Sequence, residues 1–380
     1  MITILDVLFN PNSPYMWLLI LGIIAGALAI IIRPFATFAK FAYPNAKFES
    51  IGNPFVNETN LQRYLDSSDL QQFIDQLNSQ KDYNISETKT SRIQSELDQQ
   101  FVNTIYMMKQ DSTKKMQTFY DTYLELIDAN LLKTALKQHI NTDHVDETLS
   151  NHAVSPKIKK HLLILAKTDS EDMLKTLKQL QYPDYITSLI TAEEKEFSSF
   201  ALDAAVDKLF ITQLKNSNVP YKCSEAKDVF IKRMIDIQTI KHLLRAKHLS
   251  YDADHCKQLL INDGYELAFW KQEDLCTAED TTDFINKLEG TQYYKPLKNR
   301  LDKNISKTTS VQPYTDAIDL IWLHLVKNIS TAHYSTMGPT LRFLEYKQIE
   351  IRNLKIIAKG IAEKMPSNLI SPLLITEEAT

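Results

Sequence analysis

One stretch of the sequence occurs three times, and this repetition constrains the fold more than any other feature. The copies begin at Ile127, Ile235 and Ile349, so they start 108 and 114 residues apart. Each copy begins with an aliphatic residue and an acid, followed by a small or aliphatic residue and a polar one. After one variable position come an aliphatic residue and a lysine, and a second base follows later. Such a period is too long for a stack of short repeats, so it predicts three related domains.

Each copy has the composition of a helix, because no glycine or proline interrupts it before Gly360. The acids Asp128, Asp236 and Glu350, here called the repeat acids, share a helix face with aliphatic residues four and seven places on. The bases of the same copy lie roughly 140° or more around the helix. We therefore expect each acid to find its partner on another helix, either a backbone cap or a base.

The bases of the three copies form i,i+4 pairs, here called the repeat bases. They are Lys133 and Lys137, Lys241 and Arg245, and Lys355 and Lys359. One hypothesis is that these pairs line a surface that binds an acidic partner. The alternative is a solvated outer face, which is where charged residues of a helix usually lie. The repeat acids themselves are interpreted as structural, each holding its own domain together.

A second element recurs in the same order before each copy. A short helix is followed by a loop containing Tyr83, Tyr185 or Tyr293, and the repeated stretch begins 50, 55 or 61 residues after the last leucine of that helix. Polar and turn-forming residues near positions 150 and 265 interrupt the helical pattern. The predicted units are an N-terminal segment over 1–40, followed by helical domains over 41–150, 151–265 and 266–380.

Composition favours an all-α fold and excludes several classes of function. Only seven glycines occur in 380 residues, which argues against Gly-rich phosphate-binding folds. The formal net charge of −4, with mixed signs throughout, predicts no nucleic-acid binding. The chain has no recognisable nucleophile, metal or dinucleotide motif. We therefore predict no catalytic residues, no metal ligands and no cofactor.

The N-terminal segment has the features of a membrane helix. Residues 16–32 carry no charge and are almost wholly apolar, which is the short end of what spans a bilayer. Arg33 and Lys40 follow this run, so the positive-inside rule places the N-terminus outside and the rest of the chain in the cytoplasm. Gly22 and Gly26 either let another helix pack closely or are the small residues common in any membrane helix. The alternative for the whole run is a buried helix of a soluble protein.

Several motifs, taken together and in order, resemble the C subunit of archaeal A-type ATP synthases, which belongs to the C/d family of V-type ATPase subunits. They are Tyr43–Lys47, Ile235–Lys247, Leu259–Tyr265, Leu288–Tyr293 and Glu350–Lys355. The resemblance covers roughly residues 41–375. The first copy of the repeat fits the family pattern less well than the other two, and the membrane helix lies outside the common family core.

The resemblance implies an all-helical funnel of three similar domains around a pseudo-threefold axis. It implies a non-catalytic rotor subunit on the cytoplasmic face of the cell membrane, present once per complex. Its expected partners are the D and F subunits of the central stalk and the proteolipid ring (the K or c subunits), and through them the catalytic A/B hexamer. The alternatives are a membrane-tethered helical scaffold unrelated to rotary ATPases and a membrane-anchored hydrolase, for which the sequence offers no clustered site.

Overall fold

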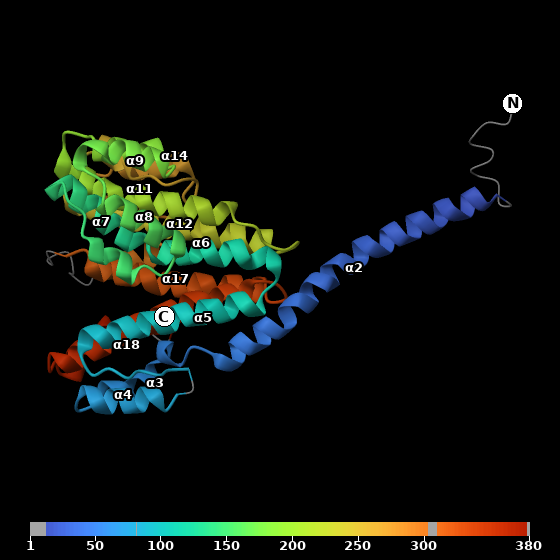
Figure 1. Ribbon diagram of the computed structural model, residues 1–380, viewed down its shortest axis with the longest axis horizontal. Helices are drawn as coiled ribbons and strands as arrows, with labels where there is room; N and C mark the ends of the chain where they lie inside the picture. The colour runs from blue at the N-terminus through green and yellow to red at the C-terminus, as the bar shows by residue number, and fades with distance from the viewer. Residues whose placement is uncertain (1–12, 81, 303–309, 378–380) are drawn as a thin grey trace.

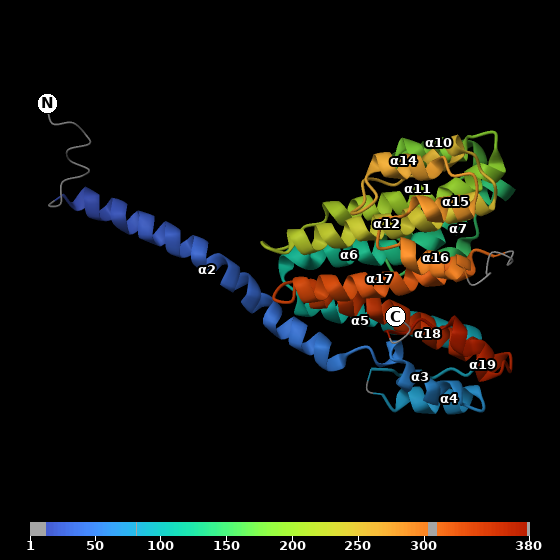
Figure 2. The same cartoon turned by 180° about the vertical axis from the view of Figure 1, so that it is seen from behind.

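The computed structural model describes residues 13–80, 82–302 and 310–377, and regular structure in these ranges is helical throughout (Figure 1). Among the described residues there is no β-strand, which confirms the all-α fold class. One long helix extends away from a body in which long helices run side by side (Figures 1 and 2).

The body is built from long helices joined in pairs by short turns. Hairpin 1 is α5 (Thr90–Asp111) with α6 (Gln117–Ile127) and α7 (Ala129–Thr142), hairpin 2 is α11 (Lys195–Asn216) with α12 (Ser224–His248), and hairpin 3 is α17 (Gln312–Ala332) with α18 (Gly338–Ala362). Each hairpin also packs on the next: α7 on α11, α12 on α17, and α18 back on α5. Because the last helix returns to the first, the hairpins form a closed helix ring.

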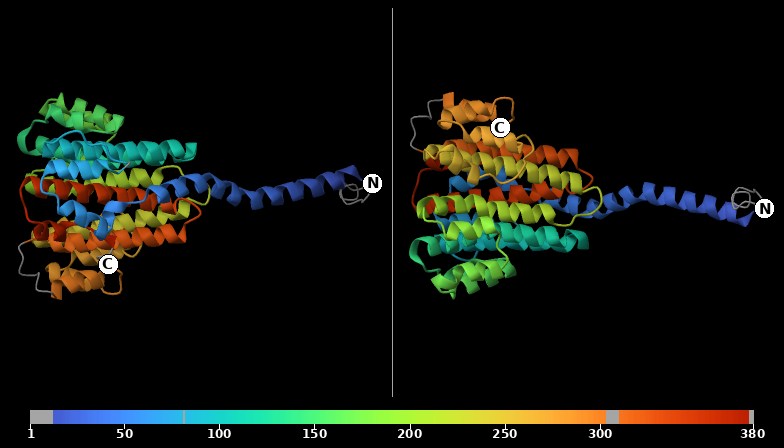
Figure 3. Two further views of the ribbon diagram at one scale, coloured as in Figure 1. Left: turned by 90° about the horizontal axis from the view of Figure 1, so that it is seen from below. Right: turned by 90° about the horizontal axis from the view of Figure 1, so that it is seen from above.

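Short helices form three groups, one between α2 and hairpin 1 and one in each connection between successive hairpins. The first contains η1 (Pro54–Val56), α3 (Glu58–Leu65) and α4 (Leu70–Asn78); the second η3 (Glu147–His152), α8 (Pro156–Ala166), η4 (Ser170–Asp172), α9 (Met173–Gln179) and α10 (Asp184–Ile190); the third α13 (Ala253–Gln258), α14 (Phe269–Cys276), α15 (Thr281–Lys287) and α16 (Tyr294–Asp302). The remaining pieces are η2 (Lys114–Met116), α19 (Ser367–Ile370) and η6 (Ser371–Leu373). The second and third groups lie at the outer edges of the body, toward the end away from α2 (Figure 3).

The N-terminal helix α2 (Pro14–Ile51) is much longer than the apolar run. The Ser13 side chain accepts a hydrogen bond from the Tyr15 N–H at 3.3 Å and caps its start. The helix continues through Pro34 and Pro44 to Gly52, whose φ of 65° ends it. A proline removes one helical hydrogen bond, and burial of the second half against the body compensates for that loss.

The repeated stretch is helical in all three copies, with one break. The second and third copies lie inside α12 and α18, whereas in the first Asp128 separates α6 from α7. The backbone of Asp128 (φ −77°, ψ −1°) leaves the regular helix. The predicted domain ranges remain a prediction, since the ring joins the three hairpins by contacts that continue across them.

Candidate functional site

Asp236 on α12 is fully buried and organises the loop between α13 and α14, within the third short-helix group. Its carboxylate accepts hydrogen bonds from the Tyr265, Glu266 and Leu267 backbone N–H groups at 3.1, 2.9 and 3.1 Å, and from the Tyr293 hydroxyl at 2.8 Å. Burial raises its pKa, and these hydrogen bonds oppose that rise.

Gly264 sits directly against this carboxylate. A Cβ at position 264 would lie 1.7 Å from Oδ1 of Asp236, so no other residue fits without displacing the loop. Glycine at 264 therefore makes the close approach between loop and acid possible.

Asp128 plays the same part for the second short-helix group. Its carboxylate accepts the Val154 N–H at 3.0 Å and the Ser155 N–H at 2.7 Å, just before α8 begins. Burial raises its pKa from the usual 3.8 to about 6, although both backbone hydrogen bonds act to lower it. The predicted partner of this acid, a backbone cap on another helix, is therefore what the structure contains. The break at Asp128 turns the acid toward α8.

Glu350 on α18 reaches the first short-helix group, almost at the opposite end of the sequence. Its fully buried carboxylate accepts hydrogen bonds from the Phe55 N–H at 3.4 Å, the Tyr83 hydroxyl and the Lys347 ammonium at 2.6 Å. The neighbouring Asn353 donates to the Phe55 carbonyl at 3.0 Å. Glu350 thus helps to close the ring, and among the described residues its basic partner is Lys347 rather than a repeat base.

Most of the repeat bases form ion pairs with acids on the neighbouring hairpin. Lys133 and Lys137 on α7 pair with Asp207 at 2.6 Å and Asp203 at 2.5 Å on α11, Lys241 on α12 pairs with Asp319 on α17 at 2.5 Å, and Lys355 on α18 pairs with Asp98 on α5. The other two bases have partners closer in the chain. Arg245 pairs with Asp203 of its own hairpin at 3.4 Å, and Lys359 pairs with Glu363, the residue that follows α18, at 3.9 Å. The acids that pair with these bases were not predicted from the sequence. Asp203 and Asp207 are four residues apart, so they share one face of a predicted helix, and this spacing is a signal that could have revealed them. Arg245 and Lys359 are the most exposed of the six, with side chains 55% and 64% accessible.

A cavity of about 380 Å³ lies inside the helix ring. The residues that line it come from all three hairpins and include Lys133, Asp207, Lys241, Asp319 and Arg352. Because these bases and acids pair with one another, the wall carries mixed charge rather than one sign.

A buried acid outside the repeat pattern also lines this cavity, and no sequence signal had pointed to it. Glu345 accepts the Tyr123 hydroxyl and the Trp322 indole N–H, both at 2.8 Å. Burial raises the pKa of Glu345, and the two donors oppose that rise. The three residues belong to α6, α17 and α18, so this node joins hairpin 1 to hairpin 3.

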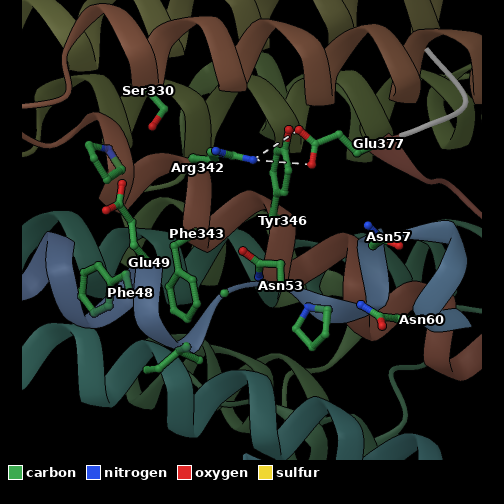
Figure 4. Close-up of a pocket in the computed structure, with 14 residues that line it drawn as sticks. Phe48, Glu49, Asn53, Asn57, Asn60, Ser330, Arg342, Phe343, Tyr346 and Glu377 are labelled. Atoms are coloured by element: carbon green, nitrogen blue, oxygen red, sulfur yellow. Dashed lines mark hydrogen bonds and ion pairs between the residues drawn. The ribbon is translucent and has the colours of Figure 1, made fainter.

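A second pocket, of about 540 Å³, lies outside the ring where α2 ends against α18 (Figure 4). Arg342 points across it to Glu377 at 3.2 Å and lies over the Tyr346 ring at 4.8 Å. Phe48 of α2 stacks on Phe343 with 5.1 Å between ring centroids. The stacking of Phe48 on Phe343 joins the end of α2 to hairpin 3. Within the described ranges no group of three or more His, Cys, Asp or Glu residues is placed to hold a metal ion.

The second half of α2 contacts the turns of all three hairpins. The Arg33 guanidinium lies over the Tyr221 ring at 4.2 Å, in the turn of hairpin 2. The Asn45 amide donates to the Tyr334 and Thr336 carbonyls at 3.0 and 2.8 Å in the turn of hairpin 3. Lys47 pairs with Asp111 at 2.7 Å, where α5 of hairpin 1 ends.

The first half of α2 is long and apolar enough to cross a membrane, and none of its apolar window is buried in the body. Length and composition alone support this candidate span. A Cβ added to Gly22 or Gly26 would meet no described atom within 4 Å, so the body does not use either glycine for packing.

Comparison with known proteins identifies the family of this chain. The sequence model of the ATP synthase (C/AC39) subunit family matches residues 44–372, from the end of α2 through the whole helix ring. The chain belongs to this family. A member of the C/AC39 family is a component of a rotary ATPase and is not catalytic by itself.

Relatives in this family cover nearly the whole chain. The C subunit of the A-type ATP synthase of Methanothermobacter thermautotrophicus is 25% identical over 363 residues, covering 94% of each chain. That of Methanosphaera stadtmanae is 24% identical over 379 residues and covers 97% of each chain. The corresponding protein of Pyrococcus horikoshii is 24% identical over 349 residues, or 89% of this chain. The Methanosphaera match covers 97% of this chain, so it leaves out far fewer residues than the 32 that precede Arg33. The match therefore includes at least part of the apolar run.

Proposed function

We propose that this C/AC39 protein is the rotor coupling component of an A-type ATP synthase. It joins the D and F subunits of the central stalk to the proteolipid ring (the K or c subunits), so that ion translocation drives ATP synthesis in the A/B hexamer, or ATP hydrolysis drives ion transport. One copy is present per complex. The observation that carries the proposal is the closed helix ring around a central cavity, with a membrane-type helix attached to one end.

The closure of the ring supports a mechanical role. A protein that transmits torque must resist shear between its helices, and charged contacts between neighbouring hairpins oppose sliding. Lys133 with Asp207 and Lys241 with Asp319 form such contacts inside the cavity, where partial burial strengthens them. In this function the repeat acids and most repeat bases hold the funnel-shaped body together around its pseudo-threefold axis.

The position of α2 indicates which end of the helix ring faces the membrane in this proposal. Because α2 leaves beside the three hairpin turns, the turn end of the ring faces the membrane and the opposite end faces the stalk. Lys137, Arg245 and Lys359 lie one helical turn farther from the hairpin turns than their pair mates. The exposed Arg245 and Lys359 are therefore the repeat bases best placed to bind an acidic stalk partner.

The membrane helix completes the proposal. In this proposal the N-terminus lies outside and the body lies on the cytoplasmic face of the cell membrane, which the bases Arg33 and Lys40 after the apolar run support. Gly22 and Gly26, open on the isolated chain, offer a surface on which a helix of the proteolipid ring packs closely. If a chain lacking residues 1–33 still joins the ring and the complex assembles, the helix is a general anchor.

The first experiment is the composition of the native complex. Membranes are solubilised in mild detergent, and the proteins that migrate with this chain at large size are identified and counted. We expect A, B, D, F and the proteolipid, with this chain at one copy. Migration alone, or with unrelated proteins, would favour the alternative of a membrane-tethered helical scaffold.

A paired variant tests stalk docking by the exposed bases. We expect Arg245→Glu with Lys359→Glu to lower ion transport per ATP hydrolysed several-fold, because each reversal repels an acidic partner while the intact complex still assembles. Lys241 is unsuitable for this test because it is only 24% exposed and pairs closely with Asp319 at 2.5 Å, whereas Arg245 is 55% exposed and lies 3.4 Å from Asp203. The matched control is Lys175→Glu, a comparably exposed lysine of α9. Normal coupling in the double variant would exclude these two bases from the mechanism.

A further inference from the structure

The turn between α11 and α12, residues 217–223, carries a small cluster of exposed basic and aromatic side chains. Tyr221 is 42% exposed and lies beneath the guanidinium of Arg33. Lys222 is exposed, and its ammonium lies 5.6 Å from the same ring. Lys222 also has a φ of 68°, a left-handed conformation that a non-glycine residue adopts at a cost of about 1 kcal/mol or more.

The contact of Tyr221 with Arg33 shows where along α2 this turn lies, and so how close it is to the apolar run. Arg33 is the first residue after that run, so on an inserted α2 it lies at the edge of the hydrocarbon core. The other two turns meet α2 at Asn45 and Lys47, roughly 18–21 Å farther along the helix. Of the three turns, the α11–α12 turn is therefore the one nearest to the membrane.

The chemistry of the turn fits a phospholipid surface. Tyrosine prefers the interface, where its ring contacts apolar groups and its hydroxyl stays in water. Lysine near an anionic leaflet contributes about 1 kcal/mol of attraction. Lys215 and Lys222 outnumber the exposed Glu225 around the turn. The Asn218 N–H donates to the Thr118 hydroxyl at 3.2 Å, which holds the turn beside the start of α6 and its exposed neighbours Lys114 and Lys115.

We propose that the α11–α12 turn is a second membrane contact, in which Tyr221, Lys222 and Arg33 bind the phosphates of anionic phospholipid headgroups. The inference rests on the proposed insertion of α2 and adds a contact that insertion alone does not require. A single helix would let the body pivot about its attachment. Two contacts, one through α2 and one through hairpin 2, fix the tilt of the helix ring over the bilayer.

The test uses the full-length chain with a fluorescent probe at Asn218→Cys, which keeps Tyr221 and Lys222. The native Cys223, Cys256 and Cys276 are buried, and burial raises the pKa of Cys223 and Cys276 to about 12, so labelling is selective for the new thiol. The labelled chain is reconstituted into vesicles of phosphatidylcholine with phosphatidylglycerol, or of phosphatidylcholine alone. Lipids with a nitroxide on the headgroup quench any probe at the surface.

Two further probes separate this inference from the proposed function. Ile24→Cys, read with nitroxides on the acyl chains, reports the insertion of α2 itself. Lys178→Cys, exposed on α9 and far from α2, reports a part of the body away from the membrane (Figure 1).

We expect headgroup nitroxides to quench the Asn218 probe in the anionic vesicles, with a loss of most of that quenching in phosphatidylcholine alone or after Tyr221→Ala with Lys222→Glu. A quenched Ile24 probe with the Asn218 probe as bright as the Lys178 probe would overturn the second contact and leave the insertion intact. An unquenched Ile24 probe would overturn both. Protection of the Asn218 probe from nitroxide lipids in the assembled complex would overturn the lipid contact by showing that a protein partner covers the turn.

Discussion

At the scale of single residues, three buried carboxylates each order a segment distant in sequence. Asp128, Asp236 and Glu350 accept backbone N–H groups that would otherwise be buried without a partner, and such groups are costly. Burial raises the pKa of all three. Their role is thus to join short-helix groups to long helices, a role that requires no reaction.

The pKa of Asp128 predicts a specific dependence of stability on pH. The carboxyl has a raised pKa of about 6 in the folded chain and the usual 3.8 when unfolded. Below pH 3.8 both states are protonated. As pH rises toward 6 the unfolded chain releases its proton first, so the free energy of unfolding falls, and above about 6 the loss is constant.

Chemical denaturation of the wild type and of Asp128→Asn across this range measures the effect. The stability of the wild type relative to the variant is expected to decline from pH 3.8 to about 6, because asparagine does not ionise. Parallel stability curves over this range would show that burial does not raise the pKa of Asp128.

At the scale of helices, ion pairs between hairpins add specificity to apolar packing. Lys133 on α7 and Asp207 on α11 have side chains only 14% and 12% exposed, and His242 on α12 bonds the same carboxylate at 3.0 Å. Burial favours a raised pKa for Asp207, but the His242 hydrogen bond and the Lys133 charge lower it below its usual range. Three helices thus meet at one carboxylate.

Removing the lysine leaves that carboxylate with one partner. We expect Lys133→Ala to lower the free energy of unfolding by about 2 kcal/mol, since the partly desolvated Asp207 loses its charge partner. In a double-mutant cycle, Lys133→Ala with Asp207→Ala should cost less than the sum of the single changes. The exposed pair of Lys175 with Asp172 is the control, with an expected effect of about 0.5 kcal/mol or less. Additive effects at Lys133 and Asp207 would mean that the pair is not coupled.

At the scale of the whole molecule, α18 joins the last part of the sequence to the first. Glu350 and Tyr83 are 267 positions apart, yet their side chains are hydrogen-bonded, and Lys355 pairs with Asp98 on α5. Closure of the helix ring therefore depends on residues of α18 rather than on any local connection.

Weakening this closure should expose the first short-helix group selectively. We expect Glu350→Gln to speed amide hydrogen exchange over residues 54–85 by roughly 30-fold, the equivalent of about 2 kcal/mol lost from a buried charged hydrogen-bond network. The second short-helix group should keep its exchange rates. Glu363→Gln, at the C-cap of the same helix and 56% exposed, is the matched control. Faster exchange everywhere, or nowhere, would show that Glu350 does not close the ring locally.

The sequence by itself determined the helices, their threefold recurrence, the apolar N-terminal run and the need of each repeat acid for a partner away from the bases beside it. These features follow from spacing along one helix, which reports which residues share a face. The sequence also predicted the short helix before the Tyr83 loop, which is α4; the Asp69 side chain caps this helix by accepting the Gln72 N–H at 2.9 Å.

Only the tertiary structure decided which partners those residues have. Spacing along a helix does not say which helix lies opposite, so the pairing of Lys133 with Asp207, the approach of Gly264 to Asp236 and the reach of Glu350 to Phe55 could not be read from it. The same holds for the passage of α2 beyond Pro34, because contacts with the body stabilise its second half. Local periodicity fixes the face a residue occupies, whereas the packing of the whole chain selects what that face meets.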